Sequence, residues 1–563
     1  MDVQKFPEDR RSYYDTVDKN DLYRMPYSGL FQTGMRTNEN REYLVYIPSG
    51  AYLSTPAVLI ICDSQDEKQR CLEESGWVEA ADRYGVIIFA VDGSCSEEEL
   101  TEMIEEMKAR DCHVVNRNYV YLMGYGDGAS KAQRLAMKNP VAFSGLALAG
   151  DCDVTDEELE AMDRIPSEHP FKPISSVPMP LWIMTERLTQ GQKQILEYWK
   201  KADRVQPVPY EKEGSSYYLP LETTVDSLIE EMVGAKIRIT EGMITSPYPG
   251  IPPVQIWDEF FSEQFRAVGI TNGNLRVWRR DEEWGIQLKS IDIDGYRREW
   301  YEYIPSVMRQ NPDYKAPLVV SLHGGSNMHR MFLPTNEWIK VAEARGFMVV
   351  FPAAALRPFR KDNWLRHAAW NSGNHQDMMD DVTFIKELLE HLFKEYNIDR
   401  SRVYASGQSM GSVMGQRLLL TLPEYFAASG TTSGVLRGGF FGDYSTPGIV
   451  EGYKRPIWII MGERDIGGGD FDNNPDTKKY VEYWTKRNET QPMDQPAYYK
   501  TGAYYTKIYH NGQGVPMVQF TTVDLKPHAC TAQDSWFLYD EFFSKYHINE
   551  NGKTVYLNTI TVE

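Results

Sequence analysis

Short runs of apolar residues alternate along the chain with longer segments in which apolar residues recur every three or four positions. In the C-terminal half, the apolar positions from Val382 to Tyr396 follow helical spacing, and Asp380-Asp381 precede them as acidic residues do at a helix start. The apolar run Val403-Tyr404-Ala405 then predicts a buried strand, followed by a glycine-rich turn and a helix from about Met410. Buried strands alternating with helices favour a mostly parallel sheet flanked by helices, so we predict an α/β fold.

The same order of elements occurs twice, with similar residues at matching places. Residues 41–61 and 298–322 share an Arg-Glu pair, a Tyr-Ile-Pro ending and a following apolar run, and Gln133-Arg134-Leu135 matches Gln416-Arg417-Leu418. Further matches pair Pro180-Leu181-Trp182-Ile183 with Pro456-Ile457-Trp458-Ile459, Glu197-Tyr198-Trp199 with Glu482-Tyr483-Trp484, and Asp258-Glu259-Phe260-Phe261 with Asp540-Glu541-Phe542-Phe543. This internal similarity predicts two copies of one fold.

The repeat sets the expected domain limits. We predict a polar N-terminal extension over residues 1–40 and a first copy over 41–265. The second copy is predicted over 266–546, with antiparallel strands in 266–300 at its start. The tail at 547–563 is a candidate edge strand.

Charge narrows the possible partners. The 563 residues contain 60 Lys and Arg against 80 Asp and Glu, a formal net charge of −20, which repels nucleic acids and anionic membrane surfaces.

No uninterrupted apolar stretch approaches the length of a membrane helix, and no signal peptide is visible at the N-terminus. The six cysteines form no CxxC pair, which favours reduced, buried thiols. We expect a cytoplasmic protein, or a secreted one if a signal has been removed, and homo-oligomerisation stays open.

Gly407-Gln408-Ser409-Met410-Gly411 is a G-x-S-x-G sequence between a predicted strand and a predicted helix. Such a turn is sharp, needs small residues on both sides, and holds its serine exposed at the tip. We therefore predict that Ser409 is a nucleophile. The alternative is an ordinary surface serine in a glycine-rich turn.

A serine nucleophile needs a base, and the base needs an acid that fixes its orientation. In folds with this turn the chain order is serine, acid, histidine. Asp465 follows the buried run Ile457–Met461 directly, and His528 lies in a loop between an apolar run and a helix. His510 is typical of a hairpin turn and His547 of a solvated helix end, so Asp465 and His528 are the predicted partners.

The oxyanion of the tetrahedral intermediate needs backbone N–H donors. We expect one from Met410, immediately after the nucleophile. Others are expected from the loop His323-Gly324-Gly325-Ser326 after an apolar strand, where His323 braces the loop. Gln408, Trp370 and Trp536 are candidate substrate contacts, as is Trp364, with packing as the alternative for the tryptophans.

No metal or organic cofactor is expected. Asp470, Asp472, Asn474 and Asp476 have the spacing of a calcium loop, but Pro475 and Val481 occupy positions where such a loop needs glycine and glutamate. His367 and His375 have no third ligand at a convincing spacing.

These motifs together resemble those of the polyhydroxybutyrate depolymerase and feruloyl esterase group of α/β-hydrolases. The matching segments are Leu322–Gly325, Trp370-Asn371, Asp380–Ile385, Tyr396–Tyr404 and Gly407–Gly411. The resemblance implies an α/β-hydrolase-like fold for the second copy, and together with the internal repeat it predicts two tandem α/β-hydrolase-like domains. It also implies a serine carboxylesterase that acts through an acyl-enzyme on short-acyl, hydroxyacyl or hydroxycinnamoyl esters. The chain departs from the group in lacking a glycine beside His528 and in having two domains where one is usual.

The first copy lacks this chemistry. Aligning the repeats places Gly126 at the position of Ser409, Leu188 at that of Asp465 and Ser246 at that of His528. Asp127 offers a carboxylate nucleophile, but no histidine stands at the base position. We expect the first copy to be inactive and to serve as a packing, lid or dimerisation partner.

Two alternatives remain for the whole chain. A serine peptidase or an acyltransferase uses the same three side chains, because the shape of the pocket selects the leaving group and the acceptor. A non-enzymatic binding scaffold is the second alternative.

Overall fold

The computed structural model describes residues 1–5, 18–25, 27–53, 55–110, 113–166, 173–221, 234–243, 248–267, 274–325, 327–355, 368–466 and 474–563. The chain forms two compact units. Tyr23–Arg279 make up the main part of unit 1, and Arg280–Pro358 with His367–Glu563 make up the main part of unit 2.

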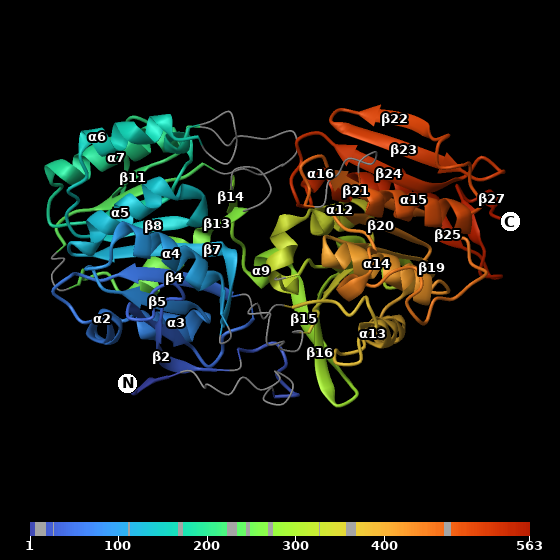
Figure 1. Ribbon diagram of the computed structural model, residues 1–563, viewed down its shortest axis with the longest axis horizontal. Helices are drawn as coiled ribbons and strands as arrows, with labels where there is room; N and C mark the ends of the chain where they lie inside the picture. Colours follow the sequence, from blue (N-terminus) through green and yellow to red (C-terminus); the bar gives the residue numbers. More distant parts are fainter. Residues whose placement is uncertain are drawn as a thin grey trace. The chain divides into compact units, whose positions relative to one another are not determined.

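Unit 1 contains a mixed, mostly parallel sheet with helices packed on it (Figure 1). In spatial order its strands are β1 (Val3–Gln4), β2 (Gly29–Gly34), β3 (Glu42–Ile47), β5 (Ile87–Val91), β4 (Thr55–Ile61), β7 (His113–Tyr125), β8 (Gly145–Ala149), β9 (Leu181–Met184), β12 (Ile237–Thr240), β11 (Ser215–Tyr218) and β10 (Tyr210–Lys212). Its longer helices are α2 (Lys68–Ser75), α3 (Trp77–Tyr84), α4 (Glu97–Lys108), α5 (Gly128–Lys138), α7 (Gln190–Asp203) and α8 (Pro253–Glu259).

Unit 2 is built in the same way. In spatial order its strands are β15 (Ile286–Ile293), β16 (Tyr296–Tyr303), β18 (Met348–Pro352), β17 (Ala316–Leu322), β19 (Ile398–Gly407), β20 (Ala428–Thr432), β21 (Ile457–Gly462), β24 (Pro516–Val523), β23 (Tyr504–His510) and β22 (Ala497–Thr501). Its main helices are α12 (Trp338–Arg345), α13 (Asp381–Glu395), α14 (Met410–Thr421), α15 (Pro475–Arg487) and α16 (Ala532–Phe537).

The two sheets share one topology. From β2 to β10 in unit 1 and from β15 to β22 in unit 2, the strands follow the same spatial order. Their pairings also run in the same directions, antiparallel at both ends of the series and parallel between. Two copies of one α/β fold would have this arrangement. Because of this shared topology, a strand-to-helix turn follows β7 in unit 1 and β19 in unit 2.

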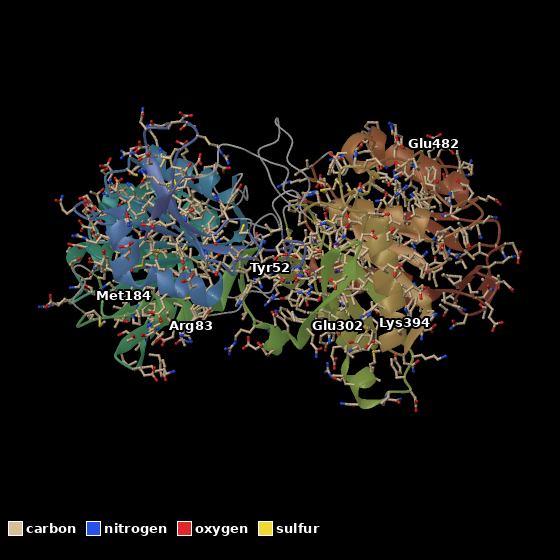
Figure 2. The ribbon with its side chains drawn as sticks, turned by 90° about the horizontal axis from the view of Figure 1, so that it is seen from below. Tyr52, Arg83, Met184, Glu302, Lys394 and Glu482 are labelled. Carbon is tan, nitrogen blue, oxygen red and sulfur yellow. The ribbon has the colours of Figure 1, made fainter. Side chains whose placement is uncertain are left out.

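Apolar patterning explains the layers of unit 2. Every residue of β17, β18 and β21 is buried, as expected for central parallel strands covered on both faces. Helix α13 begins where the Asp380 side chain accepts the Thr383 N–H, and it buries one apolar face. Helix α14 is buried at every position, so it is a central helix. Glu302 of β16, labelled in Figure 2, is also buried. Its carboxylate accepts hydrogen bonds from Trp300 and Tyr396.

The limit between the two units lies between Arg279 and Arg280, later than the expected limit after residue 265. Strand β13 (Gln264–Ala267) and its antiparallel partner β14 (Asn274–Val277) belong to unit 1, because Arg266 donates to Ser144 and to the Phe143 carbonyl there. The antiparallel pair that begins unit 2 is β15–β16.

The C-terminal tail adds no edge strand to the main sheet. It turns back at Gly552, where φ is +73°, so that β26 (Thr554–Tyr556) pairs with β25 (Tyr546–Ile548) and then with β27 (Ile560–Thr561). These three strands form a separate small sheet among the described residues. Arg455 anchors it by donating to Thr554.

The described cysteines, Cys62, Cys71, Cys95, Cys152 and Cys530, are all buried and carry free thiols. Among the residues with an assigned structure, no helix combines the length and the apolar character that crossing a bilayer requires.

Candidate active site

Ser409 lies in a sharp turn between β19 and α14. Its φ of 55° and ψ of −115° fall in a region that residues with a side chain rarely adopt. The Ser409 N–H donates to the Thr432 carbonyl over 3.0 Å, and the Gln408 N–H donates to the Leu322 carbonyl over 3.1 Å. The turn is therefore held from two neighbouring strands, β17 and β20.

The glycines on either side of Ser409 are required by close backbone contacts. A Cβ added to Gly407 would lie 2.5 Å from the Gly411 backbone, and one added to Gly411 would lie 2.0 Å from the Leu322 carbonyl oxygen. Neither position accepts a larger residue without displacing the turn. This explains the G-x-S-x-G pattern physically.

Three predicted side chains meet at this turn. The Ser409 Oγ lies 2.8 Å from His528 Nε2, and His528 Nδ1 lies 2.5 Å from an Asp465 carboxylate oxygen. Asp465 follows β21 and His528 follows β24, so all three come from carboxyl ends of parallel strands, where ligands gather in such sheets. The Asp465 side chain is fully buried, while the His528 side chain is 26% exposed. The imidazole is thus positioned to accept the serine proton while its other nitrogen donates to the carboxylate.

Backbone donors stand close to Ser409. The Met410 N–H begins α14 and has no acceptor among the described residues. Gly324 packs against the nucleophile turn, because a Cβ added there would lie 3.4 Å from Ser409 Cβ and 2.4 Å from the Gln408 side-chain oxygen. Gly325 continues the same turn after β17. Ser326, also expected in this loop, lies outside the described residues.

His323 fixes the conformation of this loop. Its Nδ1 lies 2.8 Å from the Gly324 carbonyl, and its Nε2 accepts the Ala354 N–H over 3.0 Å. Because a carbonyl only accepts, the ring proton is on Nδ1. Full burial lowers the pKa of His323 to about 4, so the imidazole is neutral at pH 7. The ring therefore braces the loop, as the sequence predicts.

The loop that carries His528 rests on a buried ion pair that the sequence analysis missed. Lys526 Nζ lies 2.7 Å from Asp534, and both side chains are almost fully buried. Asp534 also accepts from the Thr531 N–H and the Tyr504 hydroxyl, while the Lys526 carbonyl accepts the Arg464 N–H. These bonds connect the loop of the base to the loop of the acid. The capping pattern Thr531-x-x-Asp534 was the available sequence signal.

The candidate substrate contacts have different surroundings. Gln408 is half-buried and its side chain lies over Gly324. Trp370 is fully buried and its indole N–H donates to the His323 carbonyl over 2.8 Å, so it packs behind the loop rather than contacting a ligand. Trp364 lies outside the described residues.

Trp536 packs beside a cation. Its ring lies 5.1 Å from the guanidinium of Arg345, which is itself bonded to Asp540. Arg345 ends α12 just before β18, at the amino edge of the parallel strands, whereas Ser409 follows the carboxyl edge. The ring of Trp536 therefore packs with a cation at the other edge of the sheet, and its expected role as a substrate contact stays a prediction.

No group of three or more His, Cys, Asp or Glu side chains suited to a metal occurs in the described part of the chain. His375 lies 3.0 Å from the Phe440 carbonyl through Nε2. His367, Asp470 and Asp472 lie outside the described residues.

Unit 1 has a different residue at the equivalent turn. Asp127, between β7 and α5, accepts the Ser64 N–H over 2.7 Å and also the Ser64 hydroxyl. Leu188 follows β9, and Ser246 lies outside the described residues. His113, the histidine in the described part of unit 1, begins β7 and packs on Phe89, at the opposite end of that strand from Asp127.

Part of unit 2 is similar in sequence to known proteins. Residues 303–455 match the model of the family described as Esterase PHB depolymerase. Probable acetylxylan esterase A of Aspergillus fumigatus is 28% identical over 154 residues, covering 27% of this chain and 38% of that protein. Poly(3-hydroxyalkanoate) depolymerase C of Paucimonas lemoignei is 23% identical over 268 residues, covering 42% and 59%.

A solved structure, acetyl xylan esterase from Aspergillus awamori, aligns with 46% of this chain and 99% of its own at 16% identity and a TM-score of 0.34. The sheet topology of unit 2, with helices on its faces, is that of an α/β-hydrolase-like fold. The chain spans about two fifths of the length of the acetylxylan esterase and about three fifths of the length of the depolymerase.

Lys526 tests the support of the His528 loop. Replacing Lys526 by Met should lower the free energy of unfolding by about 3–5 kcal/mol, because Asp534 is left buried and unpaired. Urea unfolding followed by circular dichroism measures the loss. The matched double variant Lys526→Met/Asp534→Asn should recover part of it, since no buried charge remains. A single variant as stable as the parent would contradict this role.

The neutral state of His323 predicts a pH dependence of stability. The pKa is about 4 in the folded protein and about 6.5 in the unfolded chain, so the unfolded chain binds more protons between these values. Stability should fall by about 3 kcal/mol as the pH drops from 6.5 to 4. His329, whose pKa burial also lowers, acts in the same direction. Melting temperatures of the parent and of His323→Gln at several pH values measure the effect, and equal slopes would contradict it.

Proposed function

We propose that unit 2 is a serine carboxylic-ester hydrolase that acts through an acyl-enzyme on short-acyl, hydroxyacyl or hydroxycinnamoyl esters. The supporting observation is the continuous hydrogen-bond chain from the Ser409 hydroxyl through His528 to the buried Asp465. The family match over residues 303–455 and the relatives named as esterases and as a depolymerase favour ester chemistry.

In the proposed first step, Ser409 Oγ attacks the ester carbonyl carbon while His528 Nε2 takes the hydroxyl proton. The negative charge that develops on the carbonyl oxygen is held by the N–H groups of Met410 and of the Gly324-Gly325 loop. These donors are fixed before the reaction, since Met410 begins a buried helix and His323 clamps the loop.

The intermediate then collapses as the carbon–oxygen bond to the alcohol breaks and His528 returns its proton to the leaving oxygen. Water attacks the acyl-Ser409 in the same manner, and the acid leaves. Asp465 orients the ring and stabilises the imidazolium. The chain and water supply every group in this sequence, so the proposal requires no cofactor.

We propose that unit 1 has no catalytic activity and acts as a packing, lid or dimerisation partner. Its equivalent turn carries Asp127, whose carboxylate is already engaged by Ser64. We also propose a cytoplasmic location, because the described thiols are buried and unpaired, as in a reducing compartment.

Removal of the nucleophile tests the proposal. Ser409→Ala in the full chain should lower kcat/KM for p-nitrophenyl acetate, methyl ferulate and hydroxybutyrate oligomers by about a thousandfold or more, with an unchanged melting temperature. Assay of the purified parent and variant on these esters and on aminoacyl amides measures this. Activity only on amides would favour a serine peptidase, and acyl transfer to added alcohols without hydrolysis would favour an acyltransferase. An inactive parent would favour a binding scaffold.

A further inference from the structure

Ser433 has, like Ser409, a positive φ. It follows β20, and its φ of 61° lies in the left-handed region that favours glycine. The residue is buried, with 3% of its surface exposed. Because glycine would occupy this conformation without strain, the structure carries the Cβ of Ser433 at a conformational cost. A strained, buried side chain beside a reactive group indicates a role for that side chain.

The Ser433 hydroxyl bonds to the loop of the base. Its Oγ donates to the Ala529 carbonyl over 3.2 Å, and Ala529 follows His528 directly. The Ser409 Oγ lies 2.8 Å from His528 Nε2. Two serines that follow the neighbouring strands β19 and β20 thus contact successive residues of the base loop.

The backbone around Ser433 is fixed to the nucleophile turn. The Thr432 carbonyl accepts the Ser409 N–H over 3.0 Å, and the Ser433 N–H donates to the Ile460 carbonyl of β21 over 2.9 Å. The Gly434 carbonyl accepts two side-chain hydrogen bonds from α14, each over 2.7 Å. This segment therefore connects the serine turn, the helix behind it and the strand that ends before the acid. A hydroxyl attached to it has a fixed position relative to Ser409.

The base loop is also held on the other side of the imidazole. Lys526 Nζ is paired with Asp534, and the Lys526 carbonyl accepts the Arg464 N–H. These contacts precede His528 by two residues, whereas the contact of Ser433 follows it by one. Loss of the Ser433 hydroxyl would therefore free one side of the loop and leave the other side held.

We propose that Ser433 is a positioning residue for His528. In this proposal its hydroxyl touches no substrate. It holds the Ala529 carbonyl and so sets the distance between His528 Nε2 and Ser409 Oγ. This distance controls the reaction rate, because the base must lie within hydrogen-bond reach of the proton that it takes. The effect on rate rests on the proposed function, whereas the effect on the position of the ring does not.

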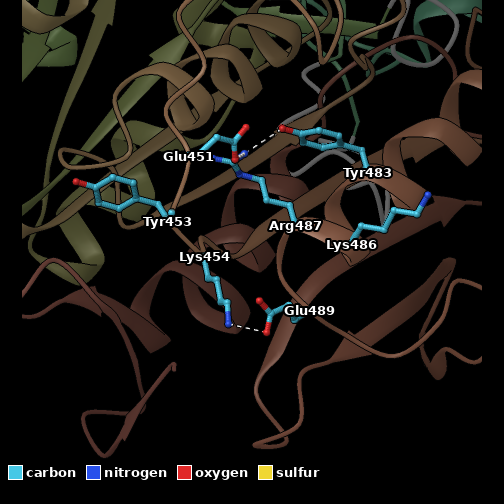
Figure 3. Close-up of a pocket in the computed structure, with 8 residues that line it drawn as sticks. Glu451, Tyr453, Lys454, Tyr483, Lys486, Arg487 and Glu489 are labelled. Carbon is cyan, nitrogen blue, oxygen red and sulfur yellow. Dashed lines mark hydrogen bonds and ion pairs between the residues drawn. The ribbon is translucent and has the colours of Figure 1, made fainter.

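The opposite end of β21 supplies a control. A groove just before this strand is lined by Glu451, Lys454, Arg487 and Glu489 among others (Figure 3). Lys454 is paired with Glu489 over 2.8 Å, and Arg487 with Glu451 over 2.7 Å. A change at Lys454 therefore alters the surroundings of the same strand without touching the contact of Ser433.

Two substitutions separate the Ser433 hydroxyl from the backbone strain. Ser433→Ala removes the hydroxyl and keeps the Cβ, whereas Ser433→Gly removes both. Each should lower kcat for p-nitrophenyl acetate about tenfold and leave KM within about twofold, because the base serves both acylation and deacylation. Ser433→Gly should nevertheless melt at or above the temperature of Ser433→Ala, since glycine is unstrained at this φ.

Two control variants should keep the parental kcat. Asp294→Gly relieves a φ of 52° in the exposed turn between β15 and β16, and Lys454→Ala breaks the pair with Glu489. Steady-state kinetics and melting temperatures of the parent and all four variants make the comparison. A parental kcat in Ser433→Ala would overturn the proposal. So would a loss of kcat that Ser433→Gly restores, because strain and not the hydroxyl would then be the cause.

Crystal structures of the parent and of Ser433→Ala test the position of the ring without any turnover. The proposal expects the His528 ring of the variant to be displaced from Ser409 or spread over two positions. A ring in the parental position would overturn it. If the parent hydrolyses no ester, the proposed function fails, and the position of the ring in the two structures still decides the role of Ser433.

Discussion

The backbone turn at Ser409 is the constraint on which the rest of unit 2 depends. A φ of 55° at a residue with a side chain is unfavourable, and it persists here because the surrounding structure holds it from several sides. The Thr432 carbonyl binds the Ser409 N–H, the Leu322 carbonyl binds the Gln408 N–H, and α14 is buried at every position. The buried strands and the buried helix α14 thus hold the Ser409 hydroxyl at the edge of the sheet.

The same topology occurs in unit 1 without the same chemistry. Its turn carries Asp127 between Gly126 and Gly128, and the Asp127 carboxylate is bonded to Ser64 in the loop after β4. This fold places one residue at the tip of the strand-to-helix turn. Whether that residue can react depends on the side chains that follow the carboxyl ends of the neighbouring strands. Unit 1 has Asp127 at this turn, and the described part of that unit places no histidine beside the Asp127 carboxylate.

Much of the site was predictable from the sequence because its residues follow strands in a fixed order. Ser409, Asp465 and His528 each come directly after an apolar run or lie in the loop that follows one, and apolar runs are the strongest signal that a single sequence contains. The Lys526–Asp534 pair was not predictable, since a lysine in a loop reads as solvated until its burial is known. Trp370 and Trp536 were ambiguous for a related reason: an aromatic residue near a site packs in the core as often as it contacts a ligand. The limit between the units was misplaced because the alternating pattern of β13 and β14 resembles that of β15 and β16, and only the contacts of Arg266 show where the first pair belongs.

The central claim is that Ser409 forms a covalent acyl intermediate with the help of His528. Peptide mass mapping of the full chain after acid quench of its reaction with p-nitrophenyl acetate tests this most directly. The account predicts one acetyl group, on the peptide that contains Ser409, and none in the His528→Ala variant. An acetyl group on another residue, or an equal amount in the His528→Ala variant, would contradict it.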